Sequence, residues 1–396
     1  MSQELFVGLR QRLLEELDMS RELEDGEILE LIDRTILGSQ ELQYRTLEEK
    51  IAFRQELFYS IRRLDVLQEL IEDNTVTEIM VNGPDHIFIE RTGHIEKWDK
   101  KFTSQERLED VIQQIVGKCN RVINESMPIV DARLENGARV HAVASPVALN
   151  GPILTIRRFP DQPITMEKLI ELGSITKECM DFLVNLVKAR YSFLIGGGTG
   201  SGKTTFLNAL SAYIPEDERV ITIEDNAELQ IQGVSNLVRL EAKTANTQGG
   251  QEITIRDLIK AALRMRPDRL VIGEVRGAEA VDLLQALNTG HEGSLSTIHA
   301  NSGKDMGSRL ETMALMGMDL PLEAVQRQII SGVDIFVHLG RMRDKSRKAL
   351  EVAEVTGIEK GEILLRPLFN YREDKGLVQV GRLKNQRKLE RAGIGL

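Results

Sequence analysis

One run of residues constrains this chain more than any other feature of its sequence: Gly197-Gly198-Thr199-Gly200-Ser201-Gly202-Lys203-Thr204. It fits the pattern G-x-x-x-x-G-K-[ST], in which backbone amides and a lysine surround phosphate groups. The preceding residues 193–195 are typical of a short buried strand, and residues 205–210 have helical spacing. The chain must therefore join a strand to a helix through a glycine-rich turn. A chance glycine-rich turn is the weaker interpretation.

The chemistry of this run predicts a nucleoside triphosphate site. Glycines let consecutive N–H groups turn toward phosphate oxygens, and the positive end of the following helix faces the same charge. We expect Lys203 to reach the β- and γ-phosphates of ATP and the Thr204 hydroxyl to bind Mg²⁺. The residues expected to contact the nucleotide here are Gly198, Thr199, Gly200, Ser201, Gly202, Lys203, Thr204 and Thr205.

Composition indicates a soluble intracellular protein of two or three domains. The chain has 396 residues, of which 41% are hydrophobic, and no apolar run approaches the ~18 residues of a membrane span. Cys119 and Cys179 lie far apart, which argues against a disulfide or a cysteine metal site. The net charge of −10 argues against broad nucleic-acid binding, so we expect no direct nucleic-acid partner, although a local basic groove stays open.

Residue composition and the helix and strand patterns divide the chain into four segments. Residues 1–61 are charged and leucine-rich, which predicts a bundle of short amphipathic helices for docking or packing. Residues 62–158 mix helix and strand patterns and predict a small α/β domain. Residues 159–165 contain two prolines and predict a linker. Residues 166–396 alternate helix and strand, as expected of a doubly wound α/β nucleotide domain.

Two acids follow apolar strands downstream of the glycine-rich run. These are Glu224 and Glu274. A single acid after a strand is commonly a helix N-cap, but two acids after a complete phosphate loop favour hydrolysis. We expect Glu274 to hold Mg²⁺ directly or through water, and we prefer Glu224 as the base that polarises the attacking water. Asp225 and Glu228 either share that work or cap the next helix.

A third apolar strand, residues 294–298, runs into His299. This position predicts that His299 senses the γ-phosphate from the end of its strand. His291 is expected to be structural or to couple neighbouring subunits. A metal site that includes Glu292 is disfavoured, because a strand separates the two histidines and no third strong ligand lies nearby.

Four arginines in the predicted small domain are candidates for contacts to phosphate: Arg133, Arg139, Arg157 and Arg158. A guanidinium from another domain or subunit neutralises charge in the transition state, as arginine fingers do. For any one of them, an ion pair with a surface acid is the simpler interpretation. The sequence does not choose among the four.

The motifs together resemble a known family. Residues 197–204, 223–228, 273–280 and 290–301 resemble the four boxes of the type II/type IV secretion ATPases. Within that superfamily, residues 77–83 and 155–159 resemble the tight-adherence (Tad/Flp) pilus assembly ATPases of the CpaF type. The resemblance covers roughly residues 62–340. Gly273 stands where many phosphate-loop enzymes carry an aspartate, and this family shares that pattern.

The resemblance implies an α/β fold with a RecA-like phosphate-loop motor domain, preceded by a smaller PAS-like α/β domain and the helical bundle. It implies a homo-hexameric ring in which ATP lies between the two domains and near a neighbouring subunit. Lys203 and Thr204 would bind phosphate and Mg²⁺, and Glu224 would be the catalytic carboxylate. Glu274 would be the acid of the second box, and the two histidines would belong to the histidine box.

The family's work is mechanical, so the resemblance also implies partners. Hydrolysis-driven domain motion acts on inner-membrane platform proteins to assemble, and in some members retract, a pilus. The expected location is the cytoplasm at the inner face of the cytoplasmic membrane, with membrane association through those partners.

Three other functions remain open. A secretion or conjugative DNA-transfer ATPase would share every box, and the acidic balance and N-terminal signatures favour the pilus motor over it. A nucleotide-operated switch would use the same loop, but its GTPase form is disfavoured because the chain has no Asn-Lys-x-Asp segment. A small-molecule kinase would need an acceptor site and a lid, yet residues 62–158 precede the nucleotide domain without interrupting it.

Overall fold

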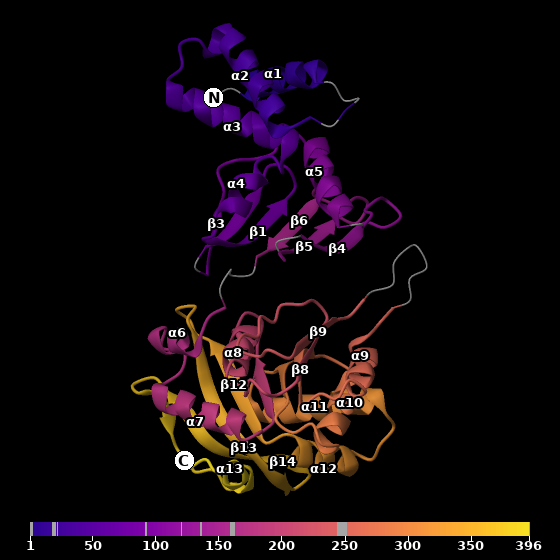
Figure 1. Cartoon of the computed structure of the whole chain (residues 1–396), viewed down its shortest axis with the longest axis vertical. Coiled ribbons are helices and arrows are strands. Elements are labelled where there is room, and N and C mark those ends of the chain that lie inside the picture. Colours follow the sequence, from indigo (N-terminus) through magenta and orange to yellow (C-terminus); the bar gives the residue numbers. More distant parts are fainter. Residues whose placement is uncertain are drawn as a thin grey trace. The chain divides into compact units, whose positions relative to one another are not determined.

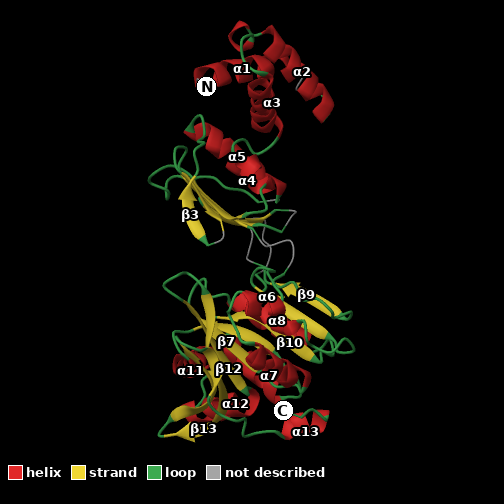
Figure 2. Cartoon of the chain, turned by 90° about the vertical axis from the view of Figure 1, so that its left-hand side faces the viewer, coloured by secondary structure: helices red, strands yellow, loops and turns green. Residues whose placement is uncertain are grey.

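The computed structural model describes residues 3–17, 21, 23–91, 93–119, 121–134, 137–158, 163–243 and 252–395. It contains two compact units, Met1–Asp161 and Gln162–Leu396 (Figures 1 and 2). Of the predicted linker, positions 159–162 lie outside the described residues. The predicted domain limits remain predictions.

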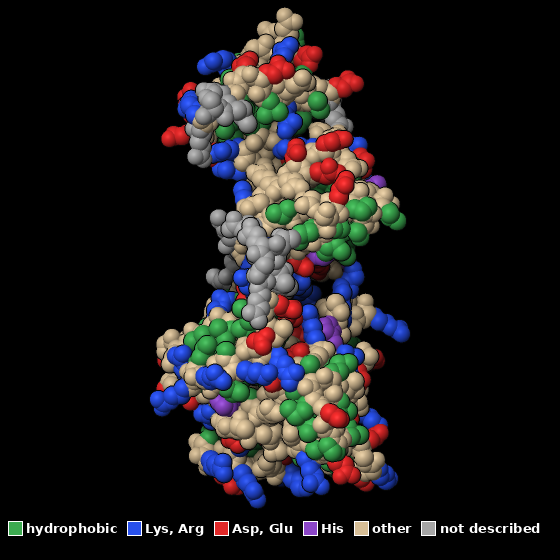
Figure 3. Space-filling view, turned by 90° about the vertical axis from the view of Figure 1, so that its right-hand side faces the viewer, with side chains coloured by type: hydrophobic (Ala, Val, Ile, Leu, Met, Phe, Trp, Pro, Cys, Tyr) green, Lys and Arg blue, Asp and Glu red, His purple; other side chains and the backbone are tan. Residues whose placement is uncertain are grey.

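In the part of the chain that the structure describes, no helix is both long enough and apolar enough to cross a membrane. Acidic and basic side chains lie interspersed on the face drawn in Figure 3. The chain has 61 Asp and Glu residues against 51 Lys and Arg residues. Its net negative charge is therefore a modest excess within a mixed surface.

The first unit begins with α1 (Gln3–Glu16), α2 (Asp25–Gly38), the 3-10 turn η1 (Gln40–Leu42) and α3 (Leu47–Arg62). Ile28, Ile32 and Ile36 recur at helical spacing and are buried along one side of α2. A capping box starts α3: the Thr46 side chain accepts from the Glu49 N–H, and the Glu49 carboxylate accepts from the Thr46 N–H. The helices expected in this segment are confirmed.

An antiparallel six-stranded sheet follows, in the order β3-β2-β1-β6-β5-β4. Its elements are α4 (Leu67–Glu72), β1 (Val76–Asn82), β2 (Ile87–Arg91), β3 (His94–Lys97), α5 (Gln105–Lys118), β4 (Ile129–Arg133), β5 (Arg139–Val143) and β6 (Ile153–Arg157). Leu108, Ile112 and Ile115 of α5 pack in one buried cluster with sheet residues such as Val81 and Ile89. Figure 2 shows α4 and α5 beside the sheet. This part of the first unit is therefore a two-layer α/β structure with a core separate from that of the preceding helices.

The second unit is built on a nine-stranded sheet in the order β15-β14-β13-β12-β7-β11-β10-β8-β9. Six strands are mutually parallel: β7 (Phe193–Gly197), β8 (Val220–Glu224), β9 (Leu237–Glu241), β10 (Arg269–Val275), β11 (Leu295–His299) and β12 (Ile335–Arg341). The helices are α6 (Met166–Glu171), α7 (Lys177–Lys188), α8 (Lys203–Ser211), α9 (Ile255–Ala262), α10 (Glu279–Asn288), α11 (Gly303–Gly317), α12 (Leu322–Gly332) and α13 (Arg387–Ala392). The strands predicted downstream of the glycine-rich run correspond to β8, β10 and β11.

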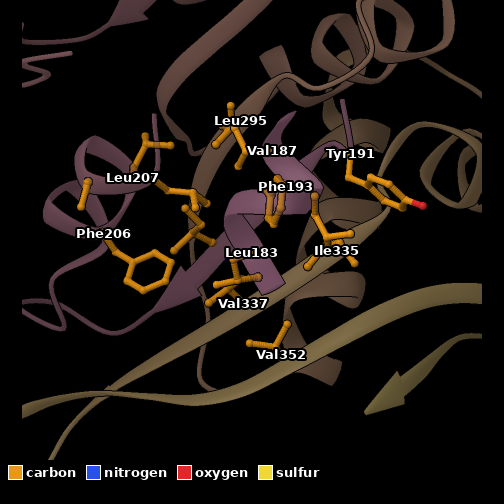
Figure 4. Close-up of a cluster of buried hydrophobic side chains, with 14 of the residues drawn as sticks. Leu183, Val187, Tyr191, Phe193, Phe206, Leu207, Leu295, Ile335, Val337 and Val352 are labelled. Atoms are coloured by element: carbon orange, nitrogen blue, oxygen red, sulfur yellow. The ribbon is translucent and has the colours of Figure 1, made fainter. Parts of the chain in front are cut away.

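Helices cover both faces of the parallel strands. On β7, Phe193 and Ile195 pack with residues of α7 and α8, whereas Leu194 packs with residues of α9 to α12. Figure 4 shows the first of these clusters, in which Leu183 of α7 and Phe206 of α8 lie around Phe193. Burial on both faces explains why β7 is apolar at consecutive positions. The doubly wound arrangement predicted from sequence is present.

The sheet continues beyond β12 with antiparallel strands that the sequence analysis does not predict. These are β13 (Arg347–Glu359), β14 (Glu362–Arg372) and β15 (Gly376–Gln379). The register between β13 and β14 shifts between Val352 and Ala353 and again between Val355 and Gly357. Each shift breaks the two-residue period by which a strand is recognised in a sequence.

A buried ion pair between Arg269 and Glu218 lies at the edge of this sheet where β10 begins. The Arg269 side chain is fully buried, and its Nε and Nη2 donate to the two carboxylate oxygens of Glu218 at 2.6 and 2.7 Å. Its Nη1 donates to the carbonyl oxygens of Val187 at 2.7 Å and Gly293 at 3.3 Å. One guanidinium thus joins the end of α7, the start of β10 and the turn before β11.

We predict that Glu218→Gln lowers the free energy of unfolding by about 3–5 kcal/mol, because it leaves a buried guanidinium without its counter-charge. Urea denaturation of the full chain measures the change. Asp181→Asn is the matched control, since Asp181 pairs with Lys177 at the surface and such pairs contribute about 0–1 kcal/mol. Equal losses in the two variants would contradict a special role for the buried pair.

Candidate functional site

The glycine-rich run forms the turn between β7 and α8. Gly202 precedes the helix with φ +91°, a backbone conformation that side-chain-bearing residues rarely adopt. At Gly197 a Cβ atom would lie 2.4 Å from Ser201 Oγ and 2.6 Å from the Leu339 carbonyl oxygen. Both positions therefore require glycine, one for its conformation and one for lack of space.

Lys203 is the first residue of α8, and its side chain folds back over the loop. Its Nζ donates to the carbonyl oxygens of Gly197 and Gly198, each at 3.2 Å, and lies 3.3 Å from Nδ1 of His299. The residue is only 8% exposed. The ammonium is thus held at the mouth of the loop by groups from β7 and from the end of β11.

His299 connects Lys203 to Glu274. It pairs with Gly197 in the register of β11 and β7, and its Nε2 lies 2.8 Å from Glu274 Oε1. An ammonium can only donate, so Nδ1 of the imidazole accepts from Lys203 and the ring proton sits on Nε2. Nε2 and Glu274 Oε1 are in close polar contact without hydrogen-bond geometry. Burial lowers the pKa of His299, which favours this neutral form.

Arg276 occupies the other oxygen of Glu274. Its Nε and Nη2 donate to Glu274 Oε2 at 2.8 and 2.7 Å, and its Nη1 lies 3.4 Å from Asp225 Oδ2. The sequence analysis missed this arginine. Arg276 directly follows β10 and lies two residues after Glu274, so its nearness in sequence to that acid was an available signal.

Glu224 ends β8 and is 3% exposed. Its Oε2 accepts from the backbone N–H groups of Glu228 and Leu229 at 2.7 and 2.8 Å, while its buried Oε1 has no hydrogen-bond partner among the described residues. Burial raises the pKa of Glu224 to about 7, although the hydrogen bonds from the two backbone N–H groups lower it. A carboxylate with a free buried oxygen and a pKa near neutrality suits proton transfer.

Gly273 makes room for this carboxylate. A Cβ atom at Gly273 would lie 3.0 Å from Cγ of Glu224. An aspartate at that position, as in many phosphate-loop enzymes, would press on the Glu224 side chain. The glycine that the sequence analysis noted as unusual therefore has a steric reason in this structure.

The structure brings Lys203, Glu224, Glu274 and His299 to the carboxyl ends of neighbouring parallel strands. His291 lies before the start of β11, and its Nδ1 is 3.2 Å from the Ala286 carbonyl oxygen. His291 therefore precedes β11, whereas His299 is the last residue of that strand.

One alternative for the acids after β8 is wrong. Asp225 and Glu228 cap no following helix, because residues 225–236 are irregular. Asp225 instead lies beside Arg276, and the Glu228 N–H donates to Glu224.

The four predicted arginines lie in the first unit. Arg158 donates to the Asp73 carbonyl oxygen and, at 2.9 Å, to Asn74 Oδ1. Arg139 lies 3.6 Å from Asp131 Oδ1. Arg133 Nε donates to the Gly137 carbonyl oxygen at 3.2 Å. Arg157 is paired with Arg139 in the register of β6 and β5. Their predicted contacts to phosphate remain predictions.

The donor set fits Mg²⁺ held together with phosphate. Thr204 lies in the first turn of α8, and Glu274 is a carboxylate at the end of the same sheet. Within the described ranges, no three acidic, histidine or cysteine side chains form a metal cage. Mg²⁺ commonly takes one or two carboxylates together with substrate phosphates and waters. The residues present match that kind of site.

The raised pKa of Glu224 predicts a pH-dependent stability. With a pKa of about 7 when folded and 4.5 as its ordinary value, Glu224 holds its proton more tightly in the folded chain. The wild type therefore loses stability as pH rises through this range, and Glu224→Gln removes that loss. Urea denaturation should show the variant gaining up to about 3 kcal/mol relative to wild type between pH 5 and pH 8. A difference that does not change with pH would contradict this.

Comparisons with known proteins agree with this geometry. A family described as type II/IV secretion system protein matches residues 62–363. A putative conjugal transfer protein of Mycobacterium tuberculosis is 34% identical over 318 residues, which cover 79% of this chain and 89% of that protein. The type IV secretion system protein VirB11 of Brucella suis is 32% identical over 303 residues, which cover 70% of this chain and 84% of that protein.

Two solved structures share the fold. The pilus retraction motor PilT with bound ADP has a TM-score of 0.53 and 19% identity, and the match covers 83% of this chain and 86% of that one. The ATPase DotB of Legionella pneumophila has a TM-score of 0.52 and 20% identity, with 73% and 79% covered. The expected architecture, a RecA-like phosphate-loop domain preceded by a smaller α/β domain and helices, is confirmed. On the family match and the two sequence relatives, this chain belongs to the type II/IV secretion system protein family.

Proposed function

We propose that this chain hydrolyses ATP to ADP and phosphate and converts the free energy into mechanical work in a pilus or secretion machine. One observation carries the proposal: Lys203, Glu224, Glu274 and His299 meet at one edge of one sheet, beside a complete phosphate loop. Membership of the secretion family supports the same activity.

The site residues divide the work of hydrolysis. The loop amides and Lys203 bind the phosphates, and a bound triphosphate draws the Lys203 ammonium away from the carbonyl oxygens of Gly197 and Gly198. Glu224 accepts a proton from the attacking water at Oε1, the oxygen without a partner. Thr204 and Glu274 would hold Mg²⁺, which would supply positive charge to neutralise the phosphate oxygens.

His299 acts as the sensor of the γ-phosphate in this scheme. Its ring lies between Lys203 and Glu274 and contacts both. When the Lys203 ammonium moves to a bound phosphate, Nδ1 of His299 loses its hydrogen-bond donor. The imidazole is therefore the first group to respond to the bound nucleotide. The effect passes to Glu274 through Nε2.

The finer proposal for the cargo is Tad/Flp pilus assembly, of the CpaF type, with retraction in addition. Residues 77–83, which lie mostly in β1, and residues 155–159, which begin in β6, support it by their resemblance to that subgroup. The second candidate is conjugative DNA transfer or secretion. The names of the M. tuberculosis and B. suis relatives favour this second candidate.

The proposed assembly is a homo-hexamer at the inner face of the cytoplasmic membrane. Inner-membrane platform proteins are the proposed partners, and they provide the contact with the membrane. The four arginines of the first unit are proposed to contact phosphate. No direct nucleic-acid contact is part of the proposal.

We predict that Lys203→Ala abolishes ATP turnover and weakens ATP binding, because the ammonium bonds to the first two carbonyl groups of the loop and is placed to transfer to phosphate. Phosphate release and calorimetry measure the two effects. Lys304→Ala is the matched control, since this lysine is 70% exposed and pairs with Glu362 on the surface. Glu224→Gln and Glu274→Gln should retain binding and lose roughly 10²–10⁴-fold in turnover. Wild-type turnover in Lys203→Ala would contradict the proposed site.

We predict that cells carrying Lys203→Ala at the natural locus make no surface pili and transfer plasmid DNA at the wild-type frequency. Electron microscopy counts the pili, and mating assays measure the transfer. Normal piliation with lost DNA transfer would contradict the pilus proposal and favour the conjugative candidate.

A further inference from the structure

A short connection joins His299, the last residue of β11, to Gly303, the first residue of α11. Its first residue, Ala300, is 4% exposed. The Ala300 N–H donates at 3.4 Å to the Gly197 carbonyl oxygen, which also accepts from Lys203. The position of the His299 ring therefore depends on how this connection is held.

Two titratable side chains from β12 and β13 hold the connection. The His338 ring of β12 is hydrogen-bonded to the backbone of Ala300. The Glu351 carboxylate of β13 accepts from the N–H of Gly303. His338 and Glu351 are paired in the register of the two strands, so their side chains lie side by side on one face of the sheet. One cross-strand pair therefore binds the connection at residues 300 and 303.

Gly303 lets the Glu351 carboxylate approach the start of α11. A Cβ atom at position 303 would lie 2.6 Å from Glu351 Oε2, which is too close for any other residue. The first N–H groups of a helix have no partner within the helix, and its positive end attracts a carboxylate. The glycine and the acid are far apart in the sequence, but each suits the other at this contact.

Other bonds fold the connection onto α11. Ser302 Oγ accepts from the Asp305 N–H at 3.0 Å, and Asp305 Oδ2 accepts from the Asn301 N–H at 2.8 Å. These bonds make residues 301–305 compact. The bonds to His338 and Glu351 fix the same residues to the sheet.

We infer that His338 and Glu351 are positioning residues for His299: they hold the connection that follows it and so fix its imidazole within the site. The inference rests on the proposed function, in which His299 senses the γ-phosphate. The imidazole contacts Lys203 at 3.3 Å and Glu274 at 2.8 Å at the same time. A displacement of about 1 Å at such a site lowers turnover by up to roughly 10²-fold.

The same strand also contacts the phosphate loop. Arg347, the first residue of β13, donates from Nε to the Gly200 carbonyl oxygen at 3.0 Å. β13 therefore holds the proposed site at two points, the loop before α8 and the connection before α11.

Steady-state ATP hydrolysis by the full chain tests the role of Glu351. Glu351→Ala should lower kcat roughly ten- to a hundredfold and leave KM within about twofold of the wild-type value, because it does not alter the phosphate loop. Glu351→Gln keeps an oxygen that accepts from the Gly303 N–H, so it should recover most of the lost kcat. Glu359→Ala is the matched control and should match wild type, since Glu359 is the exposed last residue of the same strand.

A double-mutant cycle separates positioning from a general loss of structure. If Glu351 acts through His299, adding Glu351→Ala to His299→Ala should lower kcat by no more than about twofold further. His338→Ala should behave in the same way, and it carries the test if Glu351→Ala fails to fold.

Three results would overturn the inference: losses that multiply in the double variants, unchanged kcat in Glu351→Ala, or wild-type kcat in His299→Ala. A Glu351→Gln variant as slow as Glu351→Ala would also overturn it. Failure of the proposed function looks different, because wild type would then hydrolyse no ATP or Lys203→Ala would hydrolyse it normally.

Discussion

A buried ammonium needs hydrogen-bond acceptors around it, and this requirement shapes the centre of the second unit. Lys203 finds its acceptors in the carbonyl groups at the end of β7 and in the imidazole of His299 at the end of β11. An unpaired charge in such a place costs several kcal/mol. The two strands must therefore lie side by side in the register that pairs His299 with Gly197. From His299 the polar contacts continue through Glu274 and Arg276 to Asp225.

The second acid obeys a different constraint, which is space. Glu224 lies among apolar strands with one oxygen bonded to backbone amides and the other without a partner. A Cβ atom beside it would crowd the Glu224 side chain, and Gly273 has none. The two acids of the site therefore have different surroundings. Glu274 lies against a histidine and an arginine, whereas Glu224 is buried and accepts only from backbone N–H groups. Because their surroundings differ, the two carboxyl groups are suited to different tasks.

Particular residues show what the sequence could predict. The glycine-rich run has a fixed spacing, and Glu224 and His299 each end an apolar strand, so local patterns were sufficient to find them. Parallel strands align their carboxyl ends, so their meeting could also be expected. Arg347 could not be found, because it lies in a hairpin far along the chain from the loop carbonyl group that it contacts. The buried pair of Glu218 and Arg269 could not be predicted either, because charged residues usually lie at the surface.

The contact between Arg347 and Gly200 gives the antiparallel extension of the sheet a place in the proposed nucleotide site. In the proposed function, phosphate takes the Lys203 ammonium, and the loop loses the donor that spans its first two carbonyl groups. The bond from Arg347 holds a third carbonyl group of the same loop and does not depend on Lys203. A ligand shifts a structure only through contacts that differ between its arrangements. The lysine is such a contact, and the arginine is not. β13, held between β12 and β14, therefore keeps the loop shaped for phosphate while the lysine changes partners.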